Sequence, residues 1–293
     1  MKLNIEAITK KAELLNVPFH NMIAAAVVEQ TIERLFSGAF SRTVCLRNAG
    51  GFNIEAYRKE APLKIDLQYL VRNSVSSGIV AGKPIDEDVL EELSSSLFPR
   101  KDSDFLKWKV KFIGKSIYAL GNMENYEIPL EVNFFESNEE DFLPVNEELQ
   151  MTMESEKSIK VLTYPVEKRL ADIYTLIFEK LELLGELSPY LDVVDITRNN
   201  FISGRKFAEF LAESCKKNNV ALDYKRFEIL KSYVNNKYMA KKWKSLLRVK
   251  KLQGPSWAEA LYRTCFFIKP VWQVLSNDEV FFDDWMPELG KFM

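Results

Sequence analysis

The spacing of apolar residues changes near residue 164, and this change constrains the fold of the 293-residue chain more than any other feature. Before it, short segments such as 63–70 and 108–113 alternate apolar and polar residues, which is typical of strands with one buried face. After it, apolar residues such as Val166, Leu170 and Ile173 recur at helical spacing. We therefore predict two domains: residues 1–163, of α/β (α+β) type, and residues 164–293, a helical bundle.

The first half is predicted to mix helices and strands. A helical pair over 3–37 precedes strands at 43–46, 63–70, 108–113, 126–134 and 158–163, with one helix at about 86–97. Pro129 predicts an edge strand or a bulge, because proline has no N–H to donate. After Pro165 we expect no strand. We expect a helix from Val166 to Gly185, followed by helices at about 190–198, 204–218, 223–247 and 256–275.

Composition narrows the classes of function. The 40 basic and 42 acidic residues give a net charge of -2, which points to neither nucleic acid nor membrane. Three cysteines, distant in sequence and odd in number, argue against a disulfide framework, and we expect them to pack in the core. The single histidine, His20, excludes a multi-histidine zinc site. No apolar run is long enough for a signal peptide or a spanning helix, so we expect a soluble, cytoplasmic protein without membrane contact.

Charge is unevenly distributed along the chain. Residues 136–156 carry eight acids and no base, for which we favour a solvated face. Residues 237–251 carry seven bases and no acid, with Tyr238 and Trp243 between them. Such a helix could contact phosphates while its aromatic rings stack on bases, or it could be a plain basic surface. The candidate nucleic-acid contacts are Lys241, Lys242, Lys244, Arg248 and Lys250.

Glycines and carboxylates follow one another in a suggestive order in the first half. Gly50 and Gly51 follow the strand at 43–46, Asp66 lies on the polar face of the next strand, and Glu131 lies on a later one. This order resembles the nucleotidyltransferase superfamily of the DNA polymerase β type. There a Gly-Gly or Gly-Ser turn precedes an Asp-x-Asp strand, and a later strand supplies a third acid. The resemblance implies a nucleotidyltransferase domain with a mixed sheet, in which two divalent cations hold the triphosphate.

Four stretches extend the resemblance to the AbiEii/AbiGii toxin family, the group that also holds the MenT toxins. They are the helical pair ending in VVEQTIERLFSGAF, the stretch CLRNAGGFNIEAYRKEAPLKIDL, the stretch YPVEKRLADIYTLIFEKLELLGELSPYLDVVDI with its Ala-Glu-Lys-like helix, and the aromatic-rich tail from KKWKSLLRVKKL. The resemblance implies transfer of a nucleotide from an NTP to an RNA 3′ end, such as that of tRNA, or to a protein hydroxyl. It further implies Mg²⁺ or Mn²⁺ as cofactor, a cognate antitoxin as partner, and a role in abortive infection and phage defence.

The resemblance also implies roles for individual residues. Asp66 and Glu131 would hold metal, Lys180 would neutralise triphosphate charge, and Asp192 would orient Lys180 or assist deprotonation of the acceptor hydroxyl. The residues implied on the nucleotide side are Gly50, Gly51, Lys64 and Asp195.

One carboxylate of the Asp-x-Asp pair is missing. In one alignment Lys64 replaces the first Asp, and in the other Gln68 replaces the second. The alternative is therefore a catalytically inactive relative that binds nucleotide, RNA or a protein, with Lys64 supplying the charge of a metal.

Each site residue also has a structural interpretation. Asp66 could be a solvent-facing strand residue, and Glu131 a charged edge residue that discourages pairing. Lys180 could extend from a helix flank, and Asp192 with Asp195 could be a first-turn pair favoured by the helix dipole. A pure protein-interaction module would use residues 136–156 and exposed aromatic residues near Trp285.

Overall fold

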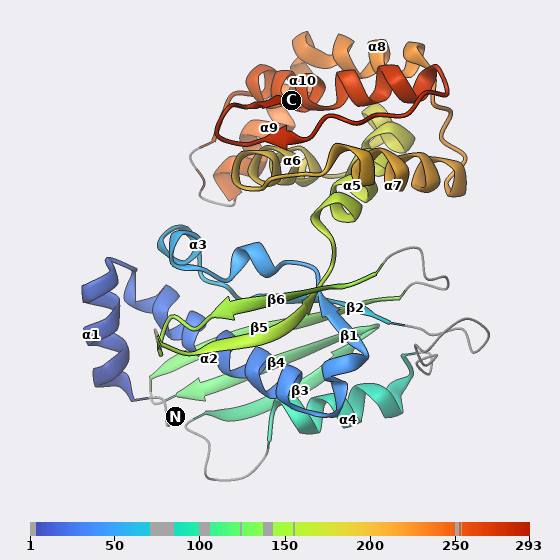
Figure 1. Ribbon diagram of the computed structural model, residues 1–293. Coiled ribbons are helices and arrows are strands. Elements are labelled where there is room, and N and C mark those ends of the chain that lie inside the picture. Colours follow the sequence, from blue (N-terminus) through green and yellow to red (C-terminus); the bar gives the residue numbers. More distant parts are fainter. Residues whose placement is uncertain are drawn as a thin grey trace, which may run out of the picture. The chain divides into compact units, whose positions relative to one another are not determined.

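The computed structural model describes residues 4–70, 85–99, 106–123, 125–136, 143–154, 156–249, 252 and 254–293. The chain divides into two compact units, Met1–Pro165 and Val166–Met293. The first contains a seven-stranded mixed sheet with helices, and the second is mostly helical (Figure 1). The predicted α/β (α+β) class with a mixed sheet and a helical second half is confirmed.

The sheet brings together the strands on which the prediction placed the functional residues. Its order is β3-β4-β5-β2-β1-β7-β6. β2 pairs in parallel with β5 and antiparallel with β1, so these three strands are neighbours in the middle of the sheet. The strands are β1 (Val44–Leu46), β2 (Lys64–Tyr69), β3 (Lys107–Ile113), β4 (Ser116–Met123), β5 (Tyr126–Glu136), β6 (Val145–Gln150) and β7 (Ser158–Thr163).

Helix α2 (Phe19–Ser37) is the centre of the first core. Its apolar run from Met22 to Val28 is buried throughout, and the helix packs against β7, α1, α3 and α4. The same core contains the buried strand residues Ile65, Leu67 and Val132. The other helices of this unit are α1 (Ile5–Leu15), α3 (Ile54–Lys59), α4 (Glu87–Leu97), and the 3-10 turns η1 (Ala39–Arg42) and η2 (Ala49–Gly51).

Three elements of the first unit were not predicted. Strand β4 follows β3 across a tight turn in which Gly114 has a φ of 57°. Strand β6 lies within the acidic segment and pairs with β7. The acidic side chains do not prevent this pairing, because backbone N–H and C=O groups form the ladder. Helix α3 is capped by Asn53, whose side chain accepts a hydrogen bond from the Ala56 N–H.

The prediction that Pro129 marks an edge strand or a bulge is wrong, because β5 lies between β4 and β2 and its register with β4 is unbroken from Tyr126 to Asn133. The Glu131 N–H donates to the Leu63 carbonyl oxygen on the β2 side. Pro129, two residues earlier, presents its nitrogen to the same side, before β2 begins at Lys64. No ladder hydrogen bond is therefore lost at the proline.

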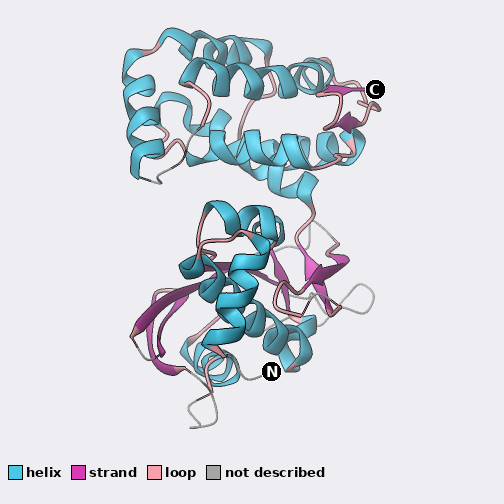
Figure 2. Ribbon diagram, turned by 90° about the vertical axis from the view of Figure 1, so that its left-hand side faces the viewer, coloured by secondary structure: helices cyan, strands magenta, loops and turns pink. Residues whose placement is uncertain are grey.

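The second unit contains six α-helices in its described residues. They are α5 (Val166–Lys180), α6 (Ser188–Asn199), α7 (Gly204–Lys217), α8 (Tyr224–Ser232), α9 (Lys237–Val249) and α10 (Trp257–Ser276), with the 3-10 turns η3 (Leu181–Leu183) and η4 (Tyr233–Asn235). The short strands β8 (Trp285–Met286) and β9 (Lys291–Phe292) contradict the expectation that no strand follows Pro165 (Figure 2).

Two helix boundaries differ from the prediction. Helix α5 ends at Lys180 rather than Gly185, because Leu181 takes a left-handed φ of 46° that ends the right-handed helix. The single helix expected over 223–247 is broken by η4 into α8 and α9.

Aromatic rings fill the core of the second unit. Phe178 and Trp272 stack with ring centroids 3.7 Å apart, and Tyr174 stacks on Phe267 at 6.0 Å. Trp285 is only 5% exposed, and its indole N–H donates to the Thr197 carbonyl oxygen at 2.7 Å. Trp285 is therefore a core residue, although Phe282 nearby is 68% exposed.

The three cysteines are free and buried, as predicted. No helix among the described residues combines the length and the apolar character that crossing a membrane requires.

Candidate functional site

Strands β2 and β5 display polar side chains on one face of the sheet. Their parallel register pairs Lys64 with Glu131, and Asp66 with Asn133. Paired residues of neighbouring strands project from the same face, so these four side chains share a face, which we call the polar face. The intervening Ile65 is buried in the core on the opposite side.

The Asp66 carboxylate is held by its neighbours. The Asn133 side-chain amide donates to Asp66 Oδ1 at 2.9 Å, and the Ser116 hydroxyl donates to Asn133 Oδ1 at 2.6 Å. Lys64 Nζ lies 3.7 Å from the same Asp66 oxygen. Asp66 is thus not simply a solvent-facing strand residue: its side chain is 22% exposed and joins a chain of contacts across β4, β5 and β2.

The turn that carries the glycines is fastened to the beginning of β2. Asn48 accepts a hydrogen bond from the Asp66 N–H and donates to the Lys64 carbonyl oxygen, both at 3.0 Å. Its amide places Gly50 and Gly51 beside the strand that carries Lys64 and Asp66.

Internal packing does not explain the two glycines. A Cβ added to Gly50 or Gly51 would meet no atom within 4 Å, and neither residue has a left-handed φ. Both are exposed at the surface. The turn therefore leaves its backbone open to a close approach from outside, as a phosphate group would require.

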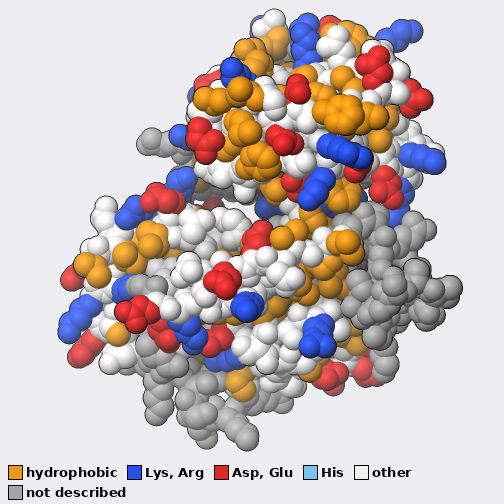
Figure 3. Space-filling view, viewed as in Figure 1, with side chains coloured by type: hydrophobic (Ala, Val, Ile, Leu, Met, Phe, Trp, Pro, Cys, Tyr) orange, Lys and Arg blue, Asp and Glu red, His pale blue; other side chains and the backbone are white. Residues whose placement is uncertain are grey.

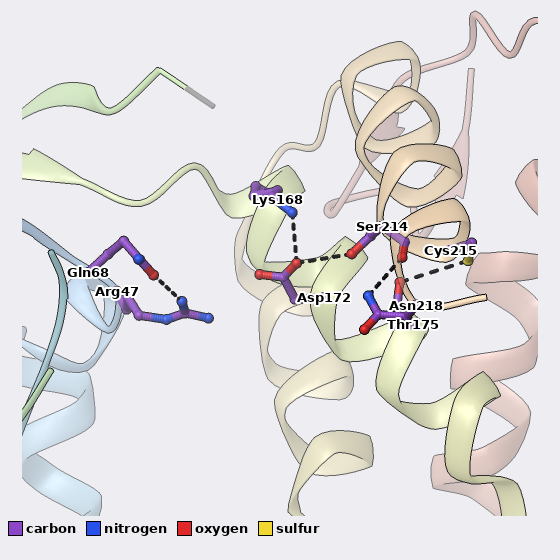
Figure 4. A network of polar contacts seen from close by, with 8 residues as sticks. All are labelled: Arg47, Gln68, Lys168, Asp172, Thr175, Ser214, Cys215 and Asn218. Atoms are coloured by element: carbon purple, nitrogen blue, oxygen red, sulfur yellow. Dashed lines mark hydrogen bonds and ion pairs between the residues drawn. The ribbon is translucent and has the colours of Figure 1, made fainter. Parts of the chain in front are cut away.

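Arg47 forms a second cluster near the C-terminal end of β2, beside Gln68. Its guanidinium lies 4.6 Å from the ring centroid of Phe135 and 4.3 Å from that of Tyr164. It also donates to Gln68 Oε1 at 2.6 Å (Figure 4). Neither Arg47 nor Phe135 was singled out in the sequence, although Arg47 lies directly after the strand that precedes the glycine turn.

The donor set does not fit a two-metal centre. Among the described residues, no group of three or more His, Cys, Asp and Glu side chains could hold a metal ion. The Asp66 oxygen accepts from an amide and lies beside an ammonium group, and Glu131 is paired in register with Lys64. Divalent cations in phosphoryl transfer need clustered carboxylate oxygens, which this face does not offer.

The interpretation of Glu131 as an edge residue is wrong, since β5 is an interior strand. Glu131 is exposed, and its neighbour in β4 is Tyr118.

The remaining predicted residues lie in the second unit. Lys180 is the last residue of α5 and pairs with Glu179 at 2.6 Å, with its side chain 46% exposed. Asp192 and Asp195 lie in the middle of α6, the first half-buried and the second exposed. The first turn of α6 holds no acid, so the interpretation of these residues as a first-turn dipole pair is wrong.

The Lys168 side chain is far more buried than that of Lys180. It is 5% exposed, and its ammonium pairs with Asp172 at 2.9 Å (Figure 4). The Ser214 hydroxyl of α7 donates to the same Asp172 oxygen at 3.3 Å. The resemblance pointed to Lys180 rather than to Lys168, which lies in the same stretch, so sequence reasoning missed this lysine.

The basic segment forms helix α9, with an exposed charged side. Lys237, Lys241, Lys244 and Arg248 are exposed and recur at helical spacing. Lys242 instead donates to the Leu184 carbonyl oxygen at 2.9 Å. Lys250 lies outside the described residues.

The expectation that Trp243 stacks on bases is wrong. Trp243 is 2% exposed, and its indole N–H donates to the Pro255 carbonyl oxygen at 2.8 Å, whereas Tyr238 is 64% exposed. On the face seen in Figure 3, side chains of both charges are interspersed over the second unit, with apolar side chains between them.

Comparison with known proteins finds seven similar chains among the solved structures. No family model matches the chain, and no curated protein matches it. One of these structures is MenT4, the nucleotidyltransferase toxin Rv2826c from Mycobacterium tuberculosis H37Rv. It has a TM-score of 0.48 and 9% identity, and the match covers 80% of this chain and 73% of that chain. A similarity of this size assigns neither a family nor an activity.

Proposed function

We propose that the chain is a nucleotidyltransferase-type protein that binds the triphosphate of an NTP on the polar face, with Lys64 supplying positive charge in place of a metal ion. The observation that carries this proposal is the position of Lys64. Its ammonium lies 3.7 Å from Asp66, its side chain is 55% exposed, and its carbonyl oxygen is bonded to the glycine turn through Asn48. A lysine in this position offers a point charge to a phosphate without metal chemistry.

The neighbouring groups have defined parts in this binding. The exposed backbone of Gly50 and Gly51 gives room for phosphate oxygens. Asp66, held by Asn133, keeps the Lys64 ammonium on the polar face. The resemblance of the glycine turn and the β2 strand to nucleotidyltransferases supports an NTP over other phosphorylated ligands.

Equilibrium binding of each fluorescent NTP to the purified full chain tests this function. We expect binding that persists in EDTA, is lost in Lys64→Ala and is largely restored in Lys64→Arg. Lys160→Ala is the matched control. Lys160 is an exposed lysine of strand β7, and like Lys64 it is paired in register with a glutamate, Glu148 of β6. Absence of NTP binding both in EDTA and in Mg²⁺ would refute the proposed function.

Nucleotidyl transfer to RNA is the second candidate. Asp66 and Glu131, the two acids to which the resemblance assigns metal binding, share the polar face of β2 and β5. Incubation with total tRNA, each radiolabelled NTP and Mg²⁺ or Mn²⁺ tests this activity. Label on RNA that disappears in Asp66→Ala would establish transfer, and label gained only in Lys64→Asp would show that Lys64 prevents it.

A toxin role and a cognate antitoxin remain predictions from the resemblance. Growth arrest on expression that is relieved by Lys64→Ala or Asp66→Ala would support a toxic activity of this site. Arrest of equal strength in both variants would contradict such a role.

A further inference from the structure

We infer that the exposed ring of Phe135, backed by the Arg47 guanidinium, is the platform on which the base of the bound nucleotide stacks. This inference rests on the proposed nucleotide site and names its base subsite. Phe135 is 41% exposed although it lies on an interior strand, whereas Phe134 beside it is 5% exposed in the core. A large ring that is left open on a mostly polar face has no role in the packing of the core.

The distance along the strand suits a nucleotide. Phe135 is paired in register with Gln68, which lies four residues after Lys64 on β2. Residues 64, 66 and 68 project from the same face, and four residues of strand span about 13 Å. This length matches the reach from the terminal phosphate of an NTP to its base, so phosphates at Lys64 place the base near Phe135.

The platform is preorganised by the contact between the Phe135 ring and the Arg47 guanidinium. Arg47 lies 4.6 Å from the Phe135 centroid and 4.3 Å from the Tyr164 centroid, and it is held by Gln68. A ring already in contact with a guanidinium loses little freedom when a base stacks on it. Stacking uses the π-face that every base has, so the platform binds all four bases with modest preference.

Binding of NTPs is compared with binding of inorganic tripolyphosphate, which has no base. We expect Phe135→Ala to weaken NTP binding about tenfold and to leave tripolyphosphate binding unchanged, while Phe135→Trp keeps both. Phe112→Ala is the matched control. Phe112 is 39% exposed, and its register opposite Ile117 places it on the other face of the sheet. Thermal unfolding verifies that each variant is folded.

The possible outcomes separate the inference from the proposed function. The base platform is refuted if Phe135→Ala binds NTP as tightly as the wild type does. It is also refuted if Phe135→Ala weakens the binding of tripolyphosphate as well as that of NTP. In both cases the phosphate site stands. If the wild type binds neither NTP nor tripolyphosphate, the proposed function and the platform are refuted together. A tenfold loss confined to NTP, with Phe112→Ala unchanged, supports the platform.

Discussion

Single residues decide the chemistry that the polar face can perform. Asn133 donates to Asp66, and the Lys64 ammonium lies 3.7 Å from the same oxygen, so the carboxylate is already engaged. A carboxylate in such surroundings is better suited to hold a lysine in position than to bind several metal ions. The identities of residues 64 and 133, rather than the number of acids in the chain, therefore separate a binding site from a two-metal centre.

Glu29 is a buried acid that links α2 to the segment after β6. It is 1% exposed, and its carboxylate accepts hydrogen bonds from the N–H groups of Thr152 and Met153. Burial raises the pKa of Glu29 above its ordinary value of 4.5, and these hydrogen bonds oppose the rise. Burial and the charge of Glu29 likewise raise the pKa of Tyr57.

We expect Glu29→Gln to remove part of the pH dependence of stability. Between pH 4.5 and the raised pKa of the folded state, the folded protein keeps a proton that the unfolded chain releases. The free energy of unfolding of the wild type therefore falls as pH rises through this interval and then levels off. Urea denaturation across the interval should show this fall in the wild type and not in Glu29→Gln.

The control for Glu29 is Glu33→Gln on the same helix, whose acid pairs with Lys157 and is 33% exposed. This variant should keep the fall. Parallel stability curves for Glu29→Gln and the wild type would contradict the prediction.

The ion pair between Lys168 and Asp172 should matter more for stability than a surface pair. Asp172→Ala leaves the nearly buried Lys168 ammonium without its carboxylate, which we expect to cost about 3 kcal/mol in the free energy of unfolding. Glu179→Ala removes the exposed pair with Lys180 and should cost within about 0.5 kcal/mol. Urea denaturation followed by tryptophan fluorescence measures both, and equal costs would disprove the distinction.

At the scale of elements, helix α9 is fixed to the core of the second unit by one side and exposes basic side chains on the other. Its buried side uses Met239 and Trp243, and its opposite side exposes Lys241, Lys244 and Arg248. A helix fixed in this way holds its charges in a constant array, which suits the regular spacing of phosphates in RNA.

We expect charge reversal at Lys241, Lys244 and Arg248 together to weaken RNA binding and to reduce its dependence on salt. Fewer counterions are released when fewer phosphates are neutralised, so the slope of log affinity against log salt should become shallower. Fluorescence anisotropy with labelled tRNA over a salt series measures this. Reversal at Lys206, Lys225 and Lys269, which are also exposed in the second unit, is the control. The same loss in both triple variants would mean that only net charge matters.

For the molecule as a whole, the division into two units has a physical basis. The first core is built around α2 and the sheet, and the second is built from the aromatic residues of α5 to α10. No residue of one core cluster belongs to the other among the described residues. Separate cores are the condition under which domains fold independently.

We therefore expect residues 166–293 to fold when expressed alone. Near-ultraviolet circular dichroism should show ordered aromatic residues, and heating should give one cooperative transition. A shorter fragment, 166–256, lacks α10 and with it Trp272 and Trp285, and it should show neither signal. A molten spectrum for residues 166–293 would mean that the second unit depends on the first.

The sequence by itself determined the class of the fold and most of its elements. Strong periodicity is local information, so alternation at Lys64–Tyr69 and helical spacing from Val166 could be read without knowing any contact. It also predicted that Asp66 and Glu131 lie on strand faces. Two of the elements that it missed, β4 and β6, have weak apolar alternation and depend on pairing with β3, β5 and β7.

Only the tertiary structure decided which side chains meet. Strand register, which depends on residues far apart in the chain, placed Asn133 beside Asp66 and Phe135 beside Gln68. The fold buried Trp243, which the local pattern had suggested as a surface ring. Contacts of this kind depend on the packing of the whole unit, and for that reason no local pattern in the sequence contains them.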